Sequence, residues 1–167
     1  MATKILHFLR LFGSSLFQPE VVRRHIPDFP RARFLAVRRY LKNPSMWRVS
    51  THPLFDGAYY AAKNPDVAQA GVNPLLHYLV NGDREGRDPH PLFSARYYQA
   101  TYNFKTRYVA SLEHYLKQGA RNGLKPDLSF DYGLYRECVD SSLSDAEILA
   151  DLSSNLGEQK RRLFIER

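Results

Sequence analysis

Polar and apolar residues follow a helical period at the start of the chain. The stretch KILHFLRLFGSSLF carries polar residues three and four positions apart, at Lys4, His7, Arg10 and Ser14. This spacing gathers them on one stripe of a helix and leaves apolar side chains over the rest of its surface. The pattern predicts a basic amphipathic helix over residues 1–13.

A second pattern begins at residue 52, where short helix-forming runs alternate with turn residues. Asp56, Asp66 and Asn73 each stand where a side-chain oxygen can accept the free amide hydrogens of a helix's first turn. The last run ends at Gly82, where we expect a left-handed C-cap. No run alternates apolar and polar residues over the length of a strand, so we expect little or no sheet.

The pattern of residues 52–89 returns in residues 90–126. Matching residues include the run HPLF, a pair of tyrosines, the run HYL and two glycines, 38 residues apart early in the unit and 37 apart later. Weaker matches place a degenerate first repeat over 14–51, and a partial fourth repeat with a C-terminal cap or tail over 127–167. Such recurrence is typical of helical-repeat proteins. The sequence predicts an all-α fold, an array of short helices in about three to four tandem repeats, degenerate at both ends.

Charge is concentrated in the first third of the chain. The sequence has 24 Lys and Arg against 17 Asp and Glu, a net charge of +7. Residues 1–51 hold ten of these bases and two of the acids, a net +8, and the remainder holds 14 bases and 15 acids, a net −1. A basic end on a nearly neutral body favours an anionic partner.

The N-terminal helix allows two interpretations. Its apolar run is shorter than the ~20 residues of a membrane-spanning helix, and Arg10 interrupts the apolar core that an export signal requires, so we expect neither. On a membrane or partner surface, apolar side chains would insert or dock and arginines would contact anionic groups. This set comprises Ile5, Phe8, Leu9, Arg10, Phe12, Arg23, Arg24, Arg38 and Arg39. Alternatively, the helix covers the apolar end of the repeats.

Histidines recur at two positions of the unit, His52 with His90 and His77 with His114. The sequence contains no HxxxH, HExxH or CxxC spacing that would make metal ligands converge, so we expect structural histidines and no metal site. The acids after Gly82 are interleaved with arginines, which favours solvated ion pairs over calcium ligation. No phosphate-binding loop, nucleophile elbow or dinucleotide fingerprint occurs, so we expect a non-catalytic protein without a cofactor.

The chain is rich in aromatic residues, with 11 tyrosines and 10 phenylalanines. Tyr60, His77, Tyr98 and His114 could line a groove for a glycan, because aromatic faces stack on sugars. Their recurrence at repeat positions favours core packing instead. Nucleic acid is the least favoured partner, because ten of the 11 tyrosines lie outside the basic first third, so base stacking and phosphate contact would not readily coincide.

The run from Phe55 to Phe93 reads F-D-x-x-Y-Y-x-x-x-N-P-D-V-x-x-A-G-V-x-P-L-x-H-Y-L-x-x-G-x-x-E-G-R-x-P-x-P-L-F. It resembles a bacterial repeat that often flanks glycosyltransferase and other polysaccharide-biosynthesis domains. The resemblance covers the repeats alone, so it implies a context in envelope glycan synthesis at the inner membrane and transfers no catalytic residue.

Two functional hypotheses follow. The first is a non-catalytic helical-repeat scaffold or accessory subunit, cytoplasmic and peripheral to the inner membrane, which binds an anionic lipid surface and a protein partner within a membrane complex. The second is an auxiliary glycan-binding module that acts with a glycosyltransferase.

Overall fold

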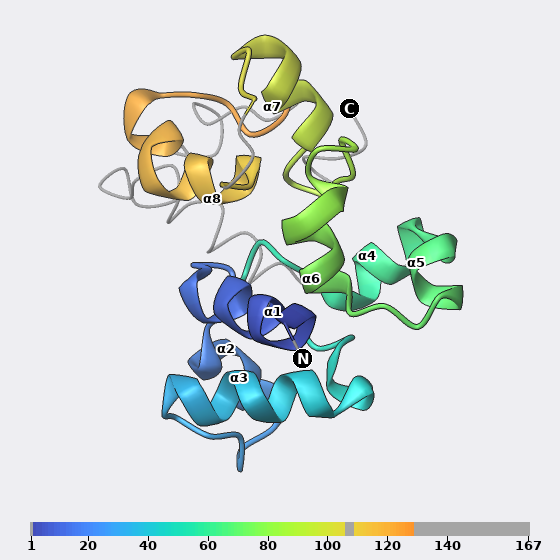
Figure 1. The fold of residues 1–167 in the computed structure, drawn as a ribbon. Coiled ribbons are helices and arrows are strands. Elements are labelled where there is room, and N and C mark those ends of the chain that lie inside the picture. Colours follow the sequence, from blue (N-terminus) through green and yellow to red (C-terminus); the bar gives the residue numbers. More distant parts are fainter. Residues whose placement is uncertain (1, 106–108, 129–167) are drawn as a thin grey trace, which may run out of the picture.

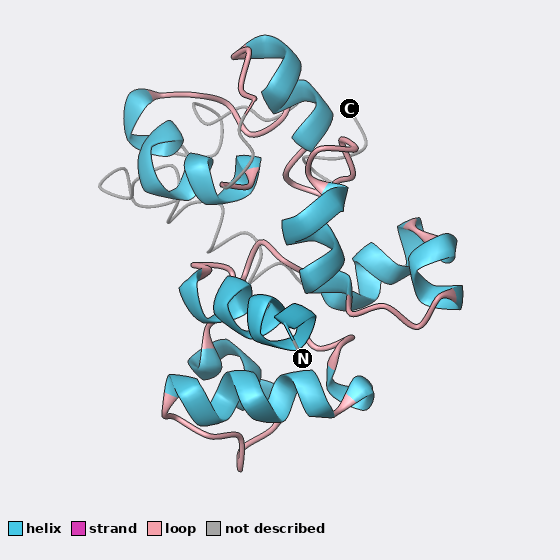
Figure 2. Ribbon diagram, viewed as in Figure 1, coloured by secondary structure: helices cyan, strands magenta, loops and turns pink. Residues whose placement is uncertain are grey.

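The computed structural model describes residues 2–105 and 109–128 of the 167-residue chain (Figure 1). Within these residues every regular element is a helix, and extended pairing is limited to two isolated bridges, His52 with Phe55 and His90 with Phe93 (Figure 2). The all-α prediction is therefore confirmed. From residue 129 onward, the predicted partial fourth repeat and tail lie outside the described residues.

The N-terminal third forms three helices and a short turn in the lower part of Figure 1. Helix α1 spans Ala2–Gly13, α2 spans Pro19–His25, α3 spans Arg33–Lys42, and the 3₁₀ turn η1 spans Pro44–Met46. Helix α1 packs on α3 and also contacts α6 of the following segment. The helix predicted over residues 1–13 is thus observed with nearly the expected bounds.

Arg33 closes the C-terminal end of α1. Its guanidinium donates to the carbonyl oxygens of Phe12 and Phe17, both at 2.7 Å, and to those of Leu11 and Ser14. The last carbonyl oxygens of a helix accept no hydrogen bond from an amide within the helix, so hydrogen bonds from Arg33 stabilise this end. The same contacts fix the turn that leads into α2.

Residues 57–82 form the middle of the molecule, with α4 at Gly57–Lys63 and α5 at Pro65–Gln69. Helix α6, Pro74–His77, continues without interruption into the π turn η2, Tyr78–Gly82. The upper part of Figure 1 holds the next group of helices. These are α7 at Ala95–Thr101, α8 at Ser111–His114, the π turn η3 at Tyr115–Gly119 and the 3₁₀ turn η4 at Ala120–Asn122.

Two predicted helix caps are observed and two are not. The Asp56 carboxylate accepts the amide hydrogens of Ala58 and Tyr59, and the Asn73 side chain accepts that of Leu76. Helix α5 instead begins at Pro65, and the Asp66 carboxylate forms an ion pair with Arg87 at 2.8 Å.

The left-handed C-cap expected at Gly82 is also not observed. The helix runs through Gly82 as a π turn, and positive φ occurs later, at Gly86 with φ +69°. Glycine is required at residue 82 for space, because a Cβ atom there would overlap the hydroxyl oxygen of Tyr60. The corresponding Gly119 is pressed in the same way against the hydroxyl of Tyr98.

Residues 52–89 and 90–126 share several contacts at corresponding positions. The Tyr60 hydroxyl lies 2.9 Å from Nδ1 of His77, and the Tyr98 hydroxyl lies 2.7 Å from Nδ1 of His114. In both segments the helix that carries the histidine widens into a π turn directly after it. In both, the amide hydrogen of the residue that caps the first helix is donated to a proline carbonyl at the end of the segment.

Aromatic rings fill the core. The largest fully buried side chains are Tyr40, Tyr60, Tyr78, Tyr98, Tyr115, Phe17, Phe29, Phe55 and Phe93. Burial of one such side chain stabilises the fold by roughly 1.5–3 kcal/mol. Of each recurring tyrosine pair, the second residue enters the core, whereas Tyr59 and Tyr97 are only half-buried. The short helices are therefore held by packing between segments, because helices of this length are marginal alone.

Candidate functional site

Helix α1 lies with its polar stripe toward the body of the protein and most of its apolar side chains toward solvent. Ser14 is buried, and Lys4 and His7 face a pocket described below. On the opposite side Ile5 is 55% exposed, Leu9 58% and Phe12 40%. A surface helix of a globular protein ordinarily has the reverse orientation.

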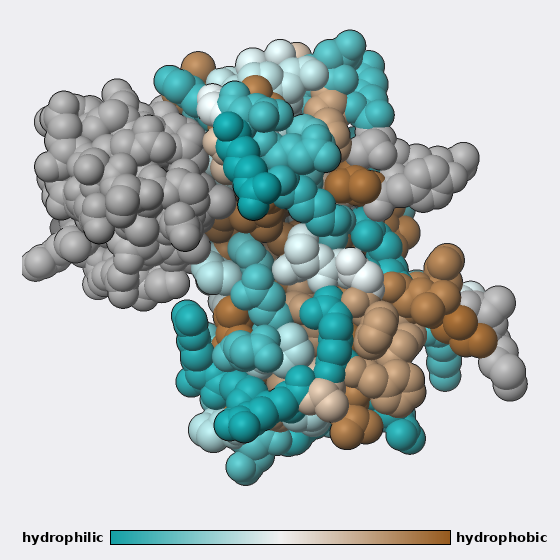
Figure 3. All heavy atoms as spheres, turned by 90° about the vertical axis from the view of Figure 1, so that its left-hand side faces the viewer, coloured by the Kyte–Doolittle hydropathy of each residue, from teal (hydrophilic) through white to brown (hydrophobic). Residues whose placement is uncertain are grey.

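The exposed apolar side chains of α1 continue onto α3. Phe8 packs against Phe12 at a ring-centroid distance of 5.8 Å and against Phe34 at 5.1 Å, so it joins the two helices. We call this surface the outer face, and it consists of Ile5, Leu6, Leu9, Phe12, Phe34 and Leu35. In Figure 3, brown side chains gather in the lower half of the molecule, where α1 and α3 lie. Exposed apolar surface gathered in this way is unusual on a globular protein and is typical of interaction sites.

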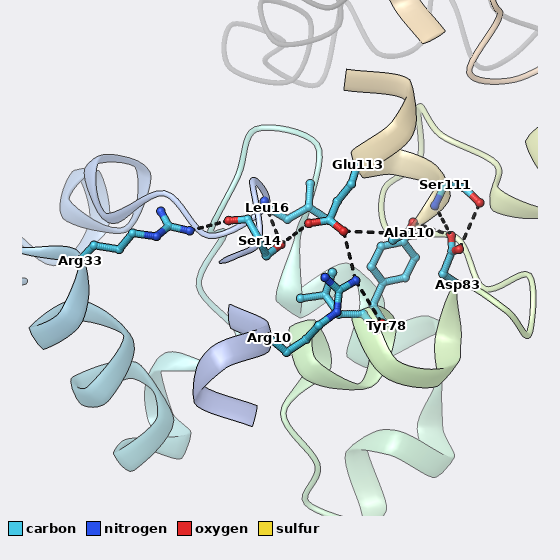
Figure 4. Close-up of polar contacts among 10 residues, drawn as sticks. Arg10, Ser14, Leu16, Arg33, Tyr78, Asp83, Ala110, Ser111 and Glu113 are labelled. Carbon is cyan, nitrogen blue, oxygen red and sulfur yellow. Dashed lines mark hydrogen bonds and ion pairs between the residues drawn. The ribbon is translucent and has the colours of Figure 1, made fainter. Parts of the chain in front are cut away.

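Glu113 at the start of α8 holds the polar stripe of α1 inward (Figure 4). Its side chain is 2% exposed and accepts a hydrogen bond from the Ser14 hydroxyl at 2.7 Å. It also forms an ion pair with Arg10 at 3.1 Å and accepts the amide hydrogen of Ala110 at 3.3 Å. A carboxylate can be buried at low cost only when it is paired in this way.

Sequence reasoning did not identify Glu113, although a signal was present. In the preceding segment the corresponding residue is Leu76, so Glu113 places a carboxylate at a register position that is otherwise apolar. A charged residue at a core position of a repeat indicates a specific partner. That partner is the polar stripe of α1, about 100 residues earlier in the chain.

A second buried carboxylate, Asp83, lies beside the first residue of α8 (Figure 4). It accepts hydrogen bonds from the Tyr78 hydroxyl and from both the amide and the hydroxyl of Ser111. Burial raises the pKa of Asp83, and the hydrogen bonds from Ser111 and Tyr78 oppose that shift. The prediction that the acids after Gly82 are solvated is therefore wrong for Asp83, because Ser111 lies against it. It is correct for Glu85, which is exposed and pairs with Arg87.

Arginines predicted to contact anionic groups are used in two ways. Arg10 pairs with Glu113, Arg23 donates to the Phe29 carbonyl, and Arg39 donates to the Asp28 carbonyl. These three bind main-chain or buried acceptors within the fold. The remaining two, Arg24 and Arg38, are exposed and form no ion pair within the described part of the chain.

A pocket of about 680 Å³ opens between α1, α3 and α6, and we call it the α1 pocket. Its basic lining residues are Lys4, His7, Arg38, Lys42 and His77. Its apolar wall includes Phe8, Leu41, Trp47, Leu76 and Val80. None of the described residues that line it is acidic. The pocket therefore combines an apolar wall with a wholly cationic set of charges.

The four residues predicted to form a glycan groove do not lie on one surface. Tyr60 and Tyr98 are fully buried. The Tyr60 hydroxyl is directed at the imidazole of His77, and the Tyr98 hydroxyl at that of His114. His77 lines the α1 pocket, whereas the ring of His114 is covered by Phe104 at a centroid distance of 4.3 Å. Stacking of a sugar on these tyrosines would require exposed rings, so the structure does not form that groove.

The contact between Tyr60 and His77 influences which hydrogen-bonding group His77 offers to the pocket. Burial raises the pKa of Tyr60 and lowers that of His77, which favours a protonated hydroxyl and a neutral imidazole. A neutral imidazole that accepts the tyrosine proton at Nδ1 carries its own hydrogen on Nε2. His77 is thereby available to the pocket as a hydrogen-bond donor.

His52 and His90 have local structural roles. Nδ1 of His52 accepts the amide hydrogen of Leu54 at 3.0 Å, and Nδ1 of His90 accepts that of Leu92 at 3.2 Å. Burial lowers the pKa of His52 to about 4, with a smaller contribution from the charge of His90. Within residues 2–105 and 109–128, no three His, Cys, Asp or Glu side chains converge as metal ligands.

None of the helices that the structure describes is both long and apolar enough to cross a bilayer. Comparison with protein-family models, with curated proteins and with solved structures finds no match to the chain.

Proposed function

We propose that this protein is a non-catalytic helical-repeat accessory protein that attaches to the cytoplasmic face of a bacterial membrane through the outer face of α1 and α3. One observation carries the proposal: Arg10 and Ser14 are turned inward, onto Glu113, and α1 exposes Ile5, Leu9 and Phe12. Stability of the fold does not require an exposed apolar face. Transfer of these side chains out of water supplies a driving force for attachment.

Charge supports an anionic surface as the partner. Residues 1–51 carry a net +8, and Arg24, Arg38 and Lys42 are exposed without an ion pair among the described residues. Each such base near an anionic lipid surface contributes about 1 kcal/mol, and each apolar side chain that becomes buried adds roughly 1.5–3 kcal/mol. Together these contributions are sufficient for peripheral binding without a spanning helix.

The repeated contacts of residues 52–126 support a scaffold role for the rest of the chain. The Tyr60–His77 and Tyr98–His114 pairs, and the glycines packed against them, recur in two successive segments. If the two segments are successive units of a repeat array, such units present a continuous surface to a protein partner. In this proposal α1 and α3 provide attachment, and the repeats provide the surface for a second subunit of a membrane complex.

The proposal is tested by flotation with inverted inner-membrane vesicles and with protein-free vesicles of the same lipids. We expect the wild-type protein to float with both, and the Ile5→Ser, Leu9→Ser, Phe12→Ser triple variant to bind at least about tenfold more weakly because three apolar contacts are lost. Leu128→Ser is the matched control, since Leu128 is an exposed apolar residue outside the outer face. Binding to neither preparation, or equal binding by the triple variant, would contradict the proposal.

A further inference from the structure

We infer that the α1 pocket binds an anionic amphiphile, a phosphate monoester that carries an apolar tail. This inference concerns a pocket between the helices rather than the outer face, and it does not depend on membrane attachment. It rests on the charge of the lining, on the apolar wall, and on the contrast with the corresponding position one segment later.

The basic lining residues of the pocket suit a doubly charged group. Lys4, Arg38 and Lys42 are exposed and form no ion pair among the described residues. Three permanent positive charges exceed what one carboxylate neutralises, whereas a phosphate monoester carries about −1.5 to −2 at pH 7 and offers three acceptor oxygens. His77 also lines the pocket, and its Nε2 can donate a hydrogen bond there when Nδ1 accepts the Tyr60 proton.

The apolar lining residues suit hydrocarbon. Leu76 and Val80 lie four residues apart on the continuous helix of α6 and η2, so they share one face. Trp47 donates its indole N–H to the Tyr40 carbonyl at 2.9 Å, which leaves its ring to present apolar surface to the pocket. A ligand that fills about 680 Å³ must therefore be apolar over much of its length and anionic at one end.

The next segment shows which features make the site. At the position of Leu76 it has Glu113, whose carboxylate would repel an anion, and Phe104 covers the histidine that corresponds to His77. The same helix frame thus forms an open cationic pocket at α6 and a closed polar junction at α8. Leu76 and the uncovered His77 thus distinguish the pocket from the corresponding position at α8.

The test uses Trp47, the only tryptophan in the chain, as a fluorescent reporter in the pocket wall. Decyl phosphate is titrated into the full-length protein below its critical micelle concentration, beside inorganic phosphate and decyl maltoside. We expect a saturable change in Trp47 emission with decyl phosphate. The response to inorganic phosphate, which lacks the tail, and to decyl maltoside, which lacks the charge, should be at least tenfold weaker. An equal response to decyl maltoside, or no saturable response to decyl phosphate, would overturn the inference.

Variants assign the response to the pocket. Arg38→Gln with Lys42→Gln should weaken decyl phosphate binding at least tenfold, as should Val80→Glu, which brings a carboxylate to the wall. These residues are exposed, so the variants should keep the far-ultraviolet circular dichroism of the wild type. Lys117→Gln, on η3 and outside the pocket, is the matched control and should bind normally. Unchanged binding by the double variant and by Val80→Glu would refute the site.

A final comparison distinguishes two sources of the phosphate group, a lipid headgroup and a free amphiphile. It also keeps this test distinct from the test of the proposed function. Loss of flotation with phosphatidic acid vesicles in the Val80→Glu variant, which changes the pocket wall and none of the bases assigned to the membrane surface, would assign a lipid headgroup as the ligand. Retained flotation, combined with lost decyl phosphate binding, would assign a free amphiphile. The outer-face triple variant should still bind decyl phosphate, so failure of membrane attachment leaves this test intact.

Discussion

The stability of the fold depends on pH through His52. Its ring is buried, Nδ1 accepts the Leu54 amide hydrogen, and its pKa is lowered to about 4 chiefly by burial. In the unfolded chain histidine has a pKa near 6.5, so between pH 6.5 and 4 the unfolded state binds more protons than the folded state. The stability that depends on neutral His52 is therefore fully present above pH 6.5 and is lost as the pH falls toward 4.

We predict that His52→Asn reduces this acid sensitivity. The side-chain oxygen of asparagine can replace Nδ1 as the acceptor for Leu54 but does not titrate. Between pH 7 and 4.5 the wild type should lose about 2–3 kcal/mol of unfolding free energy through His52, and the variant should lose correspondingly less. Urea unfolding at several pH values measures the difference, with His25→Asn as the exposed control. Parallel pH profiles for the wild type and His52→Asn would refute the assignment.

At the scale of single elements, the π turn after His77 depends on Gly82. The helix passes so close to the Tyr60 hydroxyl that a methyl group at residue 82 would overlap it. Gly13, at the end of α1, has open space where its Cβ would lie and no positive φ. The two glycines therefore differ in the reason for their presence, although both lie within helices.

We predict opposite effects for alanine at these two positions. Gly82→Ala should reduce the free energy of unfolding by roughly 1–3 kcal/mol, because Tyr60 must move within a packed core. Gly13→Ala should raise it by up to about 1 kcal/mol, because alanine loses less backbone freedom in a helix. Chemical denaturation of both variants checks the pair. A Gly82→Ala protein as stable as Gly13→Ala would show that the close approach does not matter.

At the scale of the whole molecule, the Arg10–Glu113–Ser14 contacts join the first helix to the last described part of the chain. We predict that Glu113→Gln destabilises the attachment of α1 by about 1–2 kcal/mol, because Arg10 loses its buried partner. Amide hydrogens of α1 should then exchange roughly 5- to 30-fold faster, whereas those of α4 should change little. Glu85→Gln, which removes an exposed ion pair, should leave α1 unaffected. Unchanged exchange in α1 of Glu113→Gln would contradict this role.

These contacts also mark the limit of what the sequence could predict. Periodicity identified the bounds of α1 and which side chains share a face, and local rules identified the caps at Asp56 and Asn73. Neither could predict which face of α1 turns inward, since that depends on Glu113, a residue distant in the chain. The α1 pocket was missed for the same reason, because its walls come from three separate helices. The buried position of Asp83 likewise depends on Ser111, which lies 28 residues further along.

Arg33 has a further consequence for the segment between α1 and α2. Main-chain oxygens of Leu11, Phe12, Ser14 and Phe17 converge on its guanidinium, much as carbonyl oxygens in other loops converge on a bound calcium ion. A planar cation with donors on three nitrogens can satisfy this set, whereas a lysine ammonium is a single point charge and cannot. The path of this loop is thus fixed by a residue outside it, whereas the buried side chains of Ser14, Leu16 and Phe17 anchor the loop to the core.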